Sequence, residues 1–574
     1  MTEHHARKQD TASEDTASRH TVPQDTVPPD PALPDTGAQD ADSSPTSLPY
    51  RDRWSYAWLG LAALLGIFST GRWTAPLAVW LTSVFLIRFF RTQRPVRAWL
   101  AAAPAIALSF YVGWRGLIPF GGDGAFLGMA VAAGFIGGLP FLADRVLHHR
   151  LGALARTLVF PSLVTALEFL GTLGGDLTGS WGATAYTQAA NVGLLQLASV
   201  TGLWGITFLV SWFPTVVNHL WERDFDIRRA RVPVAAFAGV LAVVLLGGQL
   251  RLALPDETAP SVRAALVAEP ALSGPDGFWP GGDVARRYYT GSELTEVEWQ
   301  ATQARMDAIH ERLFAASERE AAAGARMIFW AEANAQVRSR DEAEFLARAE
   351  AFAARHDVHL GVSLLVLPDL ATDRLQNKVV FVTPTAGVAG EYHKSIPVPG
   401  FEATLLDRGD GRPAVWDTPY GRVAVVICYD LDFPRLIREV GRAGADILVG
   451  PSNDWQAIAP LHLEMARFRA VEQGVTLLRP ATGGTSAAIG PYGRTLAALD
   501  FRSEGDRSVG VVIPTRRTPT AYTLLGDVAG WISVGASLLF LALGFRAMRR
   551  ARRIRRKTGV LTAGGAPAEV AAGS

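Results

Sequence analysis

Long apolar windows without a charged residue constrain this chain more than any other feature. They lie at 54–71, 73–87, 98–114, 124–143, 177–221, 232–250 and 528–545. Most approach the roughly 20 residues that a helix needs to cross a bilayer. A further helical pattern at 153–173 carries Glu168, and the long window at 177–221 has room for a re-entrant piece before a helix near 202–220. We therefore expect an α-helical membrane bundle of about eight transmembrane helices, with seven at 51–251 and the last at 527–547.

Basic residues in the connecting loops lie almost entirely on one side of this predicted bundle. When the loops are assigned alternately to the two sides, one side holds 21 Lys and Arg residues. The short loops of the other side hold only Arg72 and Arg115. Loops rich in Lys and Arg remain in the cytoplasm. The sequence thus predicts a multi-pass membrane protein with both termini cytoplasmic and residues 252–526 extracytoplasmic.

The two ends of the chain and its composition narrow the class of protein. Residues 1–50 are rich in Asp, Thr, Pro and Ser and lack an apolar segment, so we expect a disordered acidic tail and no signal peptide. Residues 548–574 are expected to form a basic cytoplasmic tail. A net charge of +1 argues against nucleic acid as a partner. With a single cysteine, Cys428, the chain cannot form an internal disulfide or a cysteine-based zinc site.

Residues 252–526 have the pattern of an extracytoplasmic α/β domain. Apolar runs typical of strands occur at 262–268, 326–331, 358–367, 378–383, 421–427, 446–450 and 475–479. Helical patterns separate several of these runs, at 295–323, 341–355, 433–443 and 461–473. Strands that alternate with helices predict a layered α/β fold.

Three residues with reactive side chains lie at the ends of predicted strands. Cys428 follows the strand 421–427 and precedes a helix, which predicts an exposed thiol on a turn near free backbone N–H groups. Glu332 ends the strand IFWAE, and Lys394 follows the strand 378–383. Taken singly, the three residues are also compatible with a buried apolar cysteine, a solvated acid and a surface lysine. Only 4 of the 55 basic residues are lysine, which favours a specific role for Lys394.

Together the three residues resemble the active site of the nitrilase, or carbon–nitrogen hydrolase, superfamily. Its members use Glu, Lys and Cys in this chain order on a four-layer αββα sandwich, and the matching segments here are FWAE, YHK and ICYD. The later run from PSNDW through HLEMARFRAVEQG is also similar to that superfamily. With the helices on both sides of the domain, residues 54–545 resemble the apolipoprotein N-acyltransferase family of the bacterial cell (inner) membrane.

This resemblance implies a role for each matched residue. Cys428 would be the nucleophile of a Glu–Lys–Cys triad and Glu332 its general base. Lys394 and the backbone N–H of Tyr429 would stabilise the oxyanion. Glu402, in VPGFE, is the nearest match to a second glutamate of the family, whose loop usually reads VPFGE. Possible substrate contacts are Asn453, Trp455 and Phe401.

The implied reaction moves an acyl chain from a phospholipid to the N-terminal cysteine amine of a diacylglyceryl-modified lipoprotein, through a thioester on Cys428. The resemblance implies no cofactor and no metal. Two departures from the family pattern leave alternatives open, since Ala331 replaces the usual proline and Asp430 the usual glutamate. The first alternative is a membrane-tethered carbon–nitrogen hydrolase, an amidase that uses water as the acceptor. The second is a non-catalytic membrane scaffold.

Overall fold

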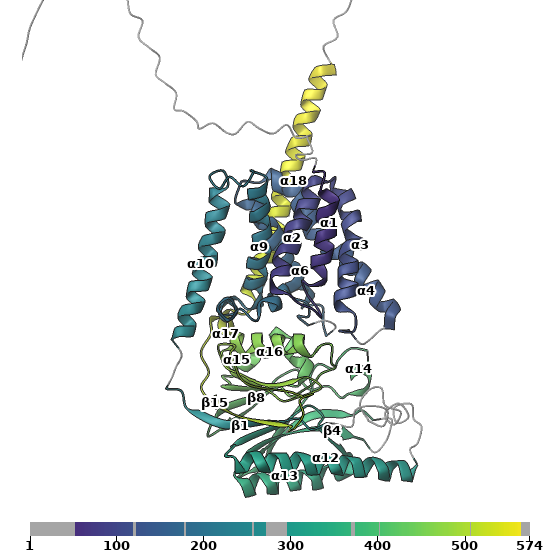
Figure 1. Ribbon diagram of the computed structural model, residues 1–574, viewed down its shortest axis with the longest axis vertical. Helices are drawn as coiled ribbons and strands as arrows, with labels where there is room; N and C mark the ends of the chain where they lie inside the picture. The colour runs from purple at the N-terminus through teal and green to yellow at the C-terminus, as the bar shows by residue number, and fades with distance from the viewer. Residues whose placement is uncertain are drawn as a thin grey trace, which may run out of the picture. The chain divides into compact units, whose positions relative to one another are not determined.

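The computed structural model describes residues 52–118, 122–176, 179–254, 258–270, 295–368, 373–400, 402–505 and 507–563. The predicted tail at 1–50, and the end of the chain beyond residue 563, lie outside the described residues. The described chain comprises a helical region, which precedes and follows an α/β region (Figure 1).

The helical region contains apolar helices at the positions that the charge-free windows predict. Its helices are α1 (Ser55–Ile67), α2 (Pro76–Thr92), α3 (Pro95–Trp114), α4 (Gly122–Gly137), α5 (Leu139–Leu147), α6 (Ala155–Gly171), α7 (Val192–Leu195), α8 (Ala198–Thr201), α9 (Leu203–Trp221), α10 (Arg231–Ala253) and α18 (Val528–Ala563). Among the described residues, four segments are long and apolar enough to cross a membrane: Pro95–Trp114, Gly122–Arg150, Arg231–Ala253 and Val528–Ala551. The last helix continues to Ala563, beyond the predicted end at 547 and into the basic tail.

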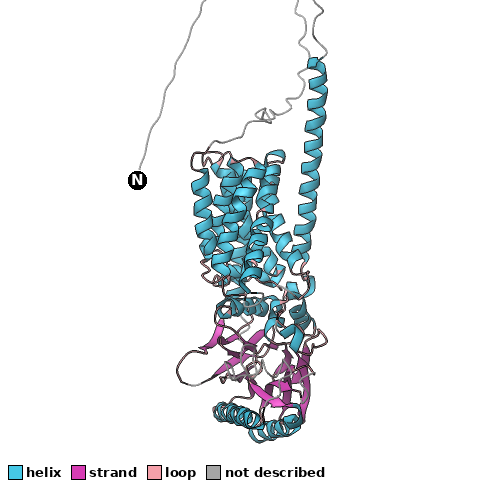
Figure 2. Cartoon of the chain, turned by 90° about the vertical axis from the view of Figure 1, so that its right-hand side faces the viewer, coloured by secondary structure: helices cyan, strands magenta, loops and turns pink. Residues whose placement is uncertain are grey.

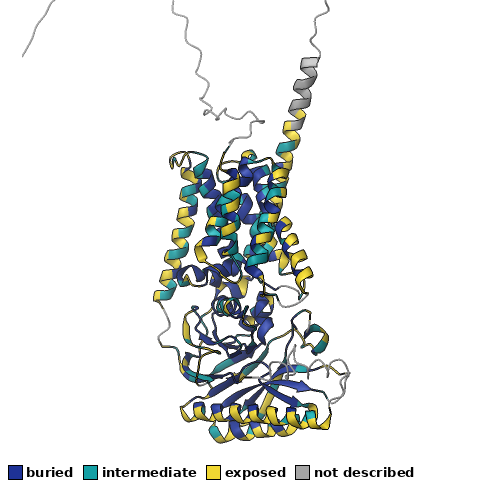
Figure 3. Cartoon of the chain, turned by 45° about the vertical axis from the view of Figure 1, so that its right-hand side comes forward, coloured by how far each residue is buried: buried dark blue, intermediate teal, exposed yellow. Residues whose placement is uncertain are grey.

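Two features of the helical region fit a lipid environment. Large apolar side chains of α10 are exposed, with Val243 at 72%, Leu246 at 70% and Leu250 at 61% exposure (Figure 3). Such a surface is typical of a membrane contact. Inside the region, the Glu168 carboxylate of α6 accepts hydrogen bonds from the Thr184 and Thr207 hydroxyls at 2.6 and 2.9 Å. Glu168 therefore braces helices through satisfied hydrogen bonds, as a buried carboxylate requires.

The α/β region is built on two larger sheets and one two-stranded pair (Figure 2). The first sheet has the order β15-β1-β2-β4-β5-β6, with β3 also paired to β4. Its strands are β1 (Ser261–Val267), β2 (Met327–Trp330), β3 (Ala335–Arg338), β4 (His359–Leu367), β5 (Gln376–Thr383), β6 (Gly387–His393) and β15 (Ser508–Pro514). The second has the order β14-β13-β11-β9-β8-β7, from β7 (Ala414–Thr418), β8 (Gly421–Val425), β9 (Ile447–Val449), β11 (Thr476–Arg479), β13 (Thr485–Ile489) and β14 (Thr495–Asp500). The short pair joins β10 (Ser452–Asn453) to β12 (Ala481–Thr482).

Alternating side chains divide between two cores and produce an αββα arrangement. In β2, Met327 and Phe329 join the core between the sheets, whereas Ile328 and Trp330 join the core beneath the outer helices. This follows from the two-residue period of a strand. The outer helices of the first sheet are α12 (Glu296–Ala322) and α13 (Glu342–His356), while the second sheet packs on α15 (Pro434–Arg442) and α16 (Ala459–Gln473) (Figure 1). The short helices α14 (Glu402–Leu405) and α17 (Ala521–Leu525) lie in connections. The predicted nitrilase-like layers are therefore present.

Helix α16 contacts both the second sheet and the helical region. Its Met465, Phe468 and Val471 pack in one apolar cluster with Tyr186 and Trp204 of the helical region. Near its end, the Glu472 carboxylate accepts a hydrogen bond from the backbone N–H of Leu203 at 3.1 Å, and the Arg469 guanidinium donates to the Tyr186 hydroxyl. Polar groups buried in such a boundary need these partners.

The glycine that ends α16 provides a test of this packing. Gly474 has φ +66°, and a Cβ at this position would meet the carbonyl oxygen of Thr518. Gly324, after α12, has φ +93° but open space around it, so it is a matched control. We expect Gly324→Ala to cost about 1–2 kcal/mol for the left-handed backbone. Gly474→Ala should cost about 1–3 kcal/mol more through overpacking. Thermal unfolding of the detergent-solubilised protein measures both, and equal losses would contradict the close approach.

Candidate active site

Cys428 begins a strained turn at the end of the second sheet. The turn, η4 (Cys428–Asp432), follows β8, and Cys428 has φ +49°, a left-handed value that is rare outside glycine. Its backbone N–H donates to the carbonyl of Pro451 at 2.8 Å. Backbone strain of this kind is often found at functional sites, where it fixes a side chain.

The thiol is not exposed, which corrects the expectation from its strand-end position. Cys428 is only 6% exposed. Tyr429 and Phe433 pack in an apolar cluster with Val398, and Ile396 and Trp181 pack against that cluster. Cys428 itself packs in the core between the two sheets, whereas its neighbour Tyr429 contacts Trp181 of the helical region.

Lys394 lies between two carboxylates in the interior of the α/β region. Its ammonium donates to Glu332 Oε1 at 2.8 Å and pairs with Glu402 Oε2 at 2.7 Å. Asn377 also donates to Glu332 Oε1, at 2.8 Å, and the backbone N–H of Val398 donates to Glu402 Oε2 at 2.7 Å. Lys394 and Glu332 have side chains that are 0% exposed, so the surface-lysine and solvated-acid interpretations are wrong.

The electrostatics of this cluster favour a neutral thiol beside a charged ion pair. Burial alone would lower the pKa of Lys394, but the charges of Glu332 and Glu402 raise it well above its usual value. Burial, followed by the Glu332 charge, raises the pKa of Cys428 well above that of a free thiol, and the Lys394 charge partly opposes this shift. A thiol in this state needs a base to become a nucleophile, and the second oxygen of Glu332, Oε2, is buried without a hydrogen-bond partner.

Asp430 connects the turn of Cys428 to the loop that follows Lys394. Its carboxylate accepts the backbone N–H groups of Ile427 at 3.0 Å and Ile396 at 2.8 Å, and the Tyr392 hydroxyl at 2.7 Å. Burial raises the pKa of Asp430 to about 6, although these hydrogen bonds oppose the shift. Aspartate at this position is thus fully engaged in holding two segments of the site together.

The supporting residues from the sequence lie near the turn, with one exception. The Tyr429 ring packs edge-on against Trp181 at 5.9 Å, and its hydroxyl donates to the carbonyl of Asp176 at 3.1 Å. Asn453 ends β10, and its backbone forms a hydrogen bond with Cys428. Trp455 packs against Trp181 at 6.0 Å and donates to the carbonyl of Leu117 at 3.1 Å, which leaves its predicted substrate contact untested. Phe401 lies outside the described residues.

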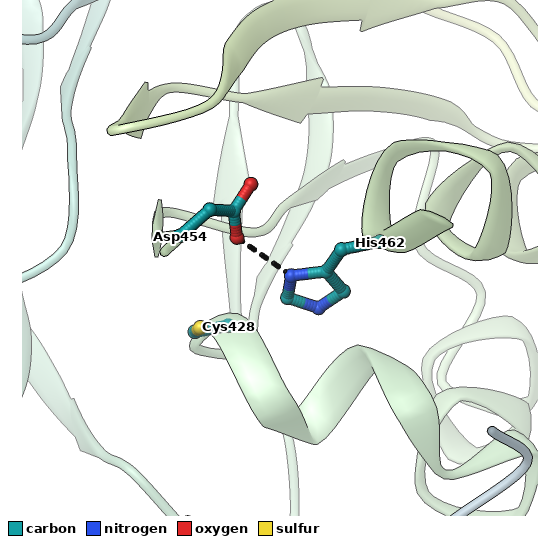
Figure 4. A group of neighbouring side chains, drawn as sticks. All are labelled: Cys428, Asp454 and His462. Atoms are coloured by element: carbon teal, nitrogen blue, oxygen red, sulfur yellow. Dashed lines mark hydrogen bonds and ion pairs between the residues drawn. The ribbon is translucent and has the colours of Figure 1, made fainter. Parts of the chain in front are cut away.

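Sequence reasoning missed a second buried polar network beside Cys428. His462 of α16 pairs through Nδ1 with Asp454 at 2.7 Å (Figure 4). Its Nε2 lies 3.3 Å from the carboxylate of Asp432. Arg479 of β11 donates to both oxygens of Asp454, at 2.8 and 2.6 Å. His462 and Asp454 both belong to the run that the sequence linked to the family, but no local spacing indicates that they meet.

Cys428, Asp454 and His462 have the types of side chain that bind metals, and their ligand atoms lie within 4.8 Å of one another (Figure 4). However, the Asp454 carboxylate already accepts from Arg479 and His462, both of which a cation would have to displace. These contacts make a hydrogen-bonded network the better description of the cluster.

A cavity of about 990 Å³ lies between the helical region and the loops near the site. One part of the cavity is lined by residues 172–173, 175–176, Trp204 and Asp527. The other part is lined by residues 395–396, 408–413 and 433–436. Cys428, Glu332 and Lys394 do not line it, but Ser395 directly follows Lys394 along the chain. The cavity is therefore a neighbouring space and not the reaction chamber itself.

Comparison with known proteins agrees with the two regions of the fold. The family model of the apolipoprotein N-acyltransferase N-terminal domain matches residues 46–216, and the carbon–nitrogen hydrolase model matches residues 296–521. The apolipoprotein N-acyltransferase of Gloeobacter violaceus is 29% identical over 83% of this chain and 91% of its own. That of Geobacter metallireducens is 28% identical over 67% of this chain and 74% of its own.

Among solved structures, an amidase from Nesterenkonia sp. is similar to 44% of this chain and 91% of its own, with 20% identity and a TM-score of 0.34. The two matched family segments and the αββα layers define a carbon–nitrogen hydrolase-type enzyme joined to a helical N-terminal domain. The two models match in order and the relatives align over most of the chain, so both regions of this chain are similar to the apolipoprotein N-acyltransferase family.

The charge of Glu332 should be visible in the titration of the thiol. Because that charge raises the pKa of Cys428, Glu332→Gln should move the alkylation midpoint to lower pH. Glu402→Gln removes an equal charge on the other side of Lys394 and should produce a smaller shift. Iodoacetamide incorporation, followed by mass spectrometry across pH, measures both midpoints. An upward shift in Glu332→Gln would contradict the arrangement.

Proposed function

We propose that the protein is an apolipoprotein N-acyltransferase that uses Cys428, Glu332 and Lys394 as its catalytic triad. It transfers an acyl chain from a phospholipid to the N-terminal cysteine amine of a diacylglyceryl-modified lipoprotein. The observation that carries this proposal is the buried Glu332–Lys394 pair, at 2.8 Å, whose charges act on the buried thiol of Cys428. The two matched family segments and the names of the relatives support the choice of substrates.

In the first half-reaction, Cys428 attacks the acyl ester of the phospholipid. Glu332 accepts the thiol proton as the sulfur–carbon bond forms, and Lys394 with the Tyr429 N–H stabilises the oxyanion. The ester carbon–oxygen bond then breaks. Glu332 returns the proton to the leaving oxygen, which gives a lysophospholipid and a thioester on Cys428.

In the second half-reaction, the lipoprotein amine attacks the thioester carbonyl. Glu332 accepts a proton from the amine, the amide bond forms and the carbon–sulfur bond breaks. The thiolate regains a proton from Glu332, which restores the starting state. Glu402 supports the cycle by pairing with Lys394, whose ammonium keeps its charge throughout.

The residues around the triad suit a lipid substrate better than the amidase alternative. The thiol is 6% exposed and packs in the core between the sheets, so free access for water is limited. The relatives are named as N-acyltransferases, and the N-terminal family model matches the helices, which gives the amidase alternative no support.

We further propose the division into a seven-helix domain at 51–251, a catalytic domain at 252–526, a last membrane helix at 527–547 and a basic tail. Together these form eight crossings of the bacterial inner membrane, with the catalytic domain extracytoplasmic. The asymmetry of basic residues supports this topology. The acidic segment at 1–50 and the basic tail would both be cytoplasmic.

The thioester has a direct test in the purified protein. Incubation with phospholipid vesicles should add the mass of one acyl group, which hydroxylamine removes. Cys428→Ser should show no such thioester, since Cys428 is the one cysteine of the sequence. As a matched control, Ser395→Ala changes a neighbouring residue without removing the nucleophile. A hydroxylamine-sensitive adduct that persists in Cys428→Ser would exclude the mechanism.

The topology has a separate test. A reporter fused after Arg251 should be active outside the cytoplasm, and one fused after Lys557 should be active inside it. Alkaline phosphatase and green fluorescent protein fusions report the two sides. Cytoplasmic signals from both positions would rule out the eight-crossing arrangement.

A further inference from the structure

The buried network around His462 connects the two chain segments that lie on either side of the thiol. Asp432 ends the turn that Cys428 begins, and Asp454 directly follows Asn453, whose backbone contacts Cys428. His462 reaches both carboxylates, one from each ring nitrogen. The side chains of all three residues are at most 5% exposed, so water does not compete for these contacts.

We propose that His462 is a positioning residue for the acyl-transfer reaction: by bridging Asp432 and Asp454 it fixes the Cys428 thiol relative to Glu332 and Lys394. This inference rests on the proposed role of Cys428 as the nucleophile. His462 acts through the backbone segments that it joins, and its ligand atoms lie within 4.8 Å of the sulfur without a hydrogen bond to it (Figure 4).

The charges around His462 explain why an imidazole suits this position. Burial alone would lower the pKa of His462, but the charges of Asp432 and Asp454 raise it to about 9. Arg479, from β11, faces the same ring at 3.0 Å and opposes the shift. At neutral pH the ring therefore carries both protons, so Nδ1 donates to Asp454 and Nε2 forms an ion pair with Asp432 at 3.3 Å.

The network continues into the helical region through Asp432. The other oxygen of that carboxylate accepts from the Trp181 indole, and its backbone carbonyl accepts from the Ser180 N–H at 2.9 Å and hydroxyl at 2.8 Å. Trp181 also packs against Tyr429, the neighbour of the nucleophile. Asp432 therefore links the loop after α6 to the turn of Cys428, and His462 of α16 contacts the same carboxylate.

Two variants of His462 separate its two contacts. Asparagine places its amide nitrogen near the position of Nδ1 and retains a donor for Asp454, whereas glutamine reaches the position of Nε2 and retains a donor for Asp432. The matched control is His310→Gln, because His310 is also buried, with 6% exposure against 4% for His462, and makes one hydrogen bond from Nε2 to the carbonyl of Gln336. His310 lies on α12, in the outer layer of the first sheet.

The measurement is single-turnover acylation of the full-length protein by vesicles of mixed phosphatidylethanolamine and phosphatidylglycerol. We expect His462→Asn and His462→Gln each to acylate about 10²-fold more slowly at saturating donor, the effect of a displaced reacting group. The donor concentration for half-saturation and the melting temperature should change little. His310→Gln should acylate at the wild-type rate.

A double-mutant cycle tests whether His462 acts through Asp432. If it does, His462→Asn combined with Asp432→Asn should be no slower than the slower single variant. Independent, multiplying losses would overturn the proposal, as would wild-type acylation by His462→Asn. A parallel fall in melting temperature, alkylation and acylation would also overturn it, since a purely structural role would then explain the data.

The same variants distinguish a failure of the proposed function from a failure of this inference. If the wild-type protein forms no acyl-enzyme from phospholipid, acylation by p-nitrophenyl acetate still measures the position of the thiol. Slower acylation by this ester in both His462 variants would support the positioning role without the lipid substrate. Equal rates in the wild type and the variants would reject it.

Discussion

A single buried ammonium between two carboxylates is the constraint on which the rest of this structure depends. Lys394 lies 2.8 Å from Glu332 and 2.7 Å from Glu402, with almost no exposure to solvent. Removing one partner from such a group would leave an uncompensated charge in the interior, which is strongly unfavourable. The strand end after β2, the residue after β6 and the helix α14 must therefore meet at one place. Two larger sheets and two helical layers provide that fixed frame.

Much of this frame could be predicted from the sequence, because it rests on local patterns. The apolar runs that became β2 and β9 are buried on both faces, so they appear as uninterrupted hydrophobic segments. The edge strands β6 and β14 were missed, since half or more of their residues are at least partly exposed and their sequences resemble loops. The triad residues were recognised from their motifs, whereas their catalytic roles stay predictions.

The remaining parts of the site could not be predicted, because they depend on contacts between distant segments. Tyr429, the residue after Cys428, packs against Trp181, which lies far earlier in the chain. The pairing of His462 with Asp432 and Asp454 likewise has no periodic signature. Helix α16 explains why these distant parts meet. It contacts the turn of Cys428 through His462 and the helical region through Arg469 and Glu472, so one element serves both.

The burial of Cys428 also bears on how this protein resists chemical damage. Oxidants attack the thiolate form of cysteine, and they act fastest on sulfur that solvent reaches. Here burial and the Glu332 charge hold the sulfur in its protonated form, and the side chain is 6% exposed. A sulfenic acid would therefore form slowly at this position. The chain has no second cysteine that could convert a sulfenic acid at Cys428 into an internal disulfide. Its protection against oxidation at this position therefore comes from the burial of the thiol.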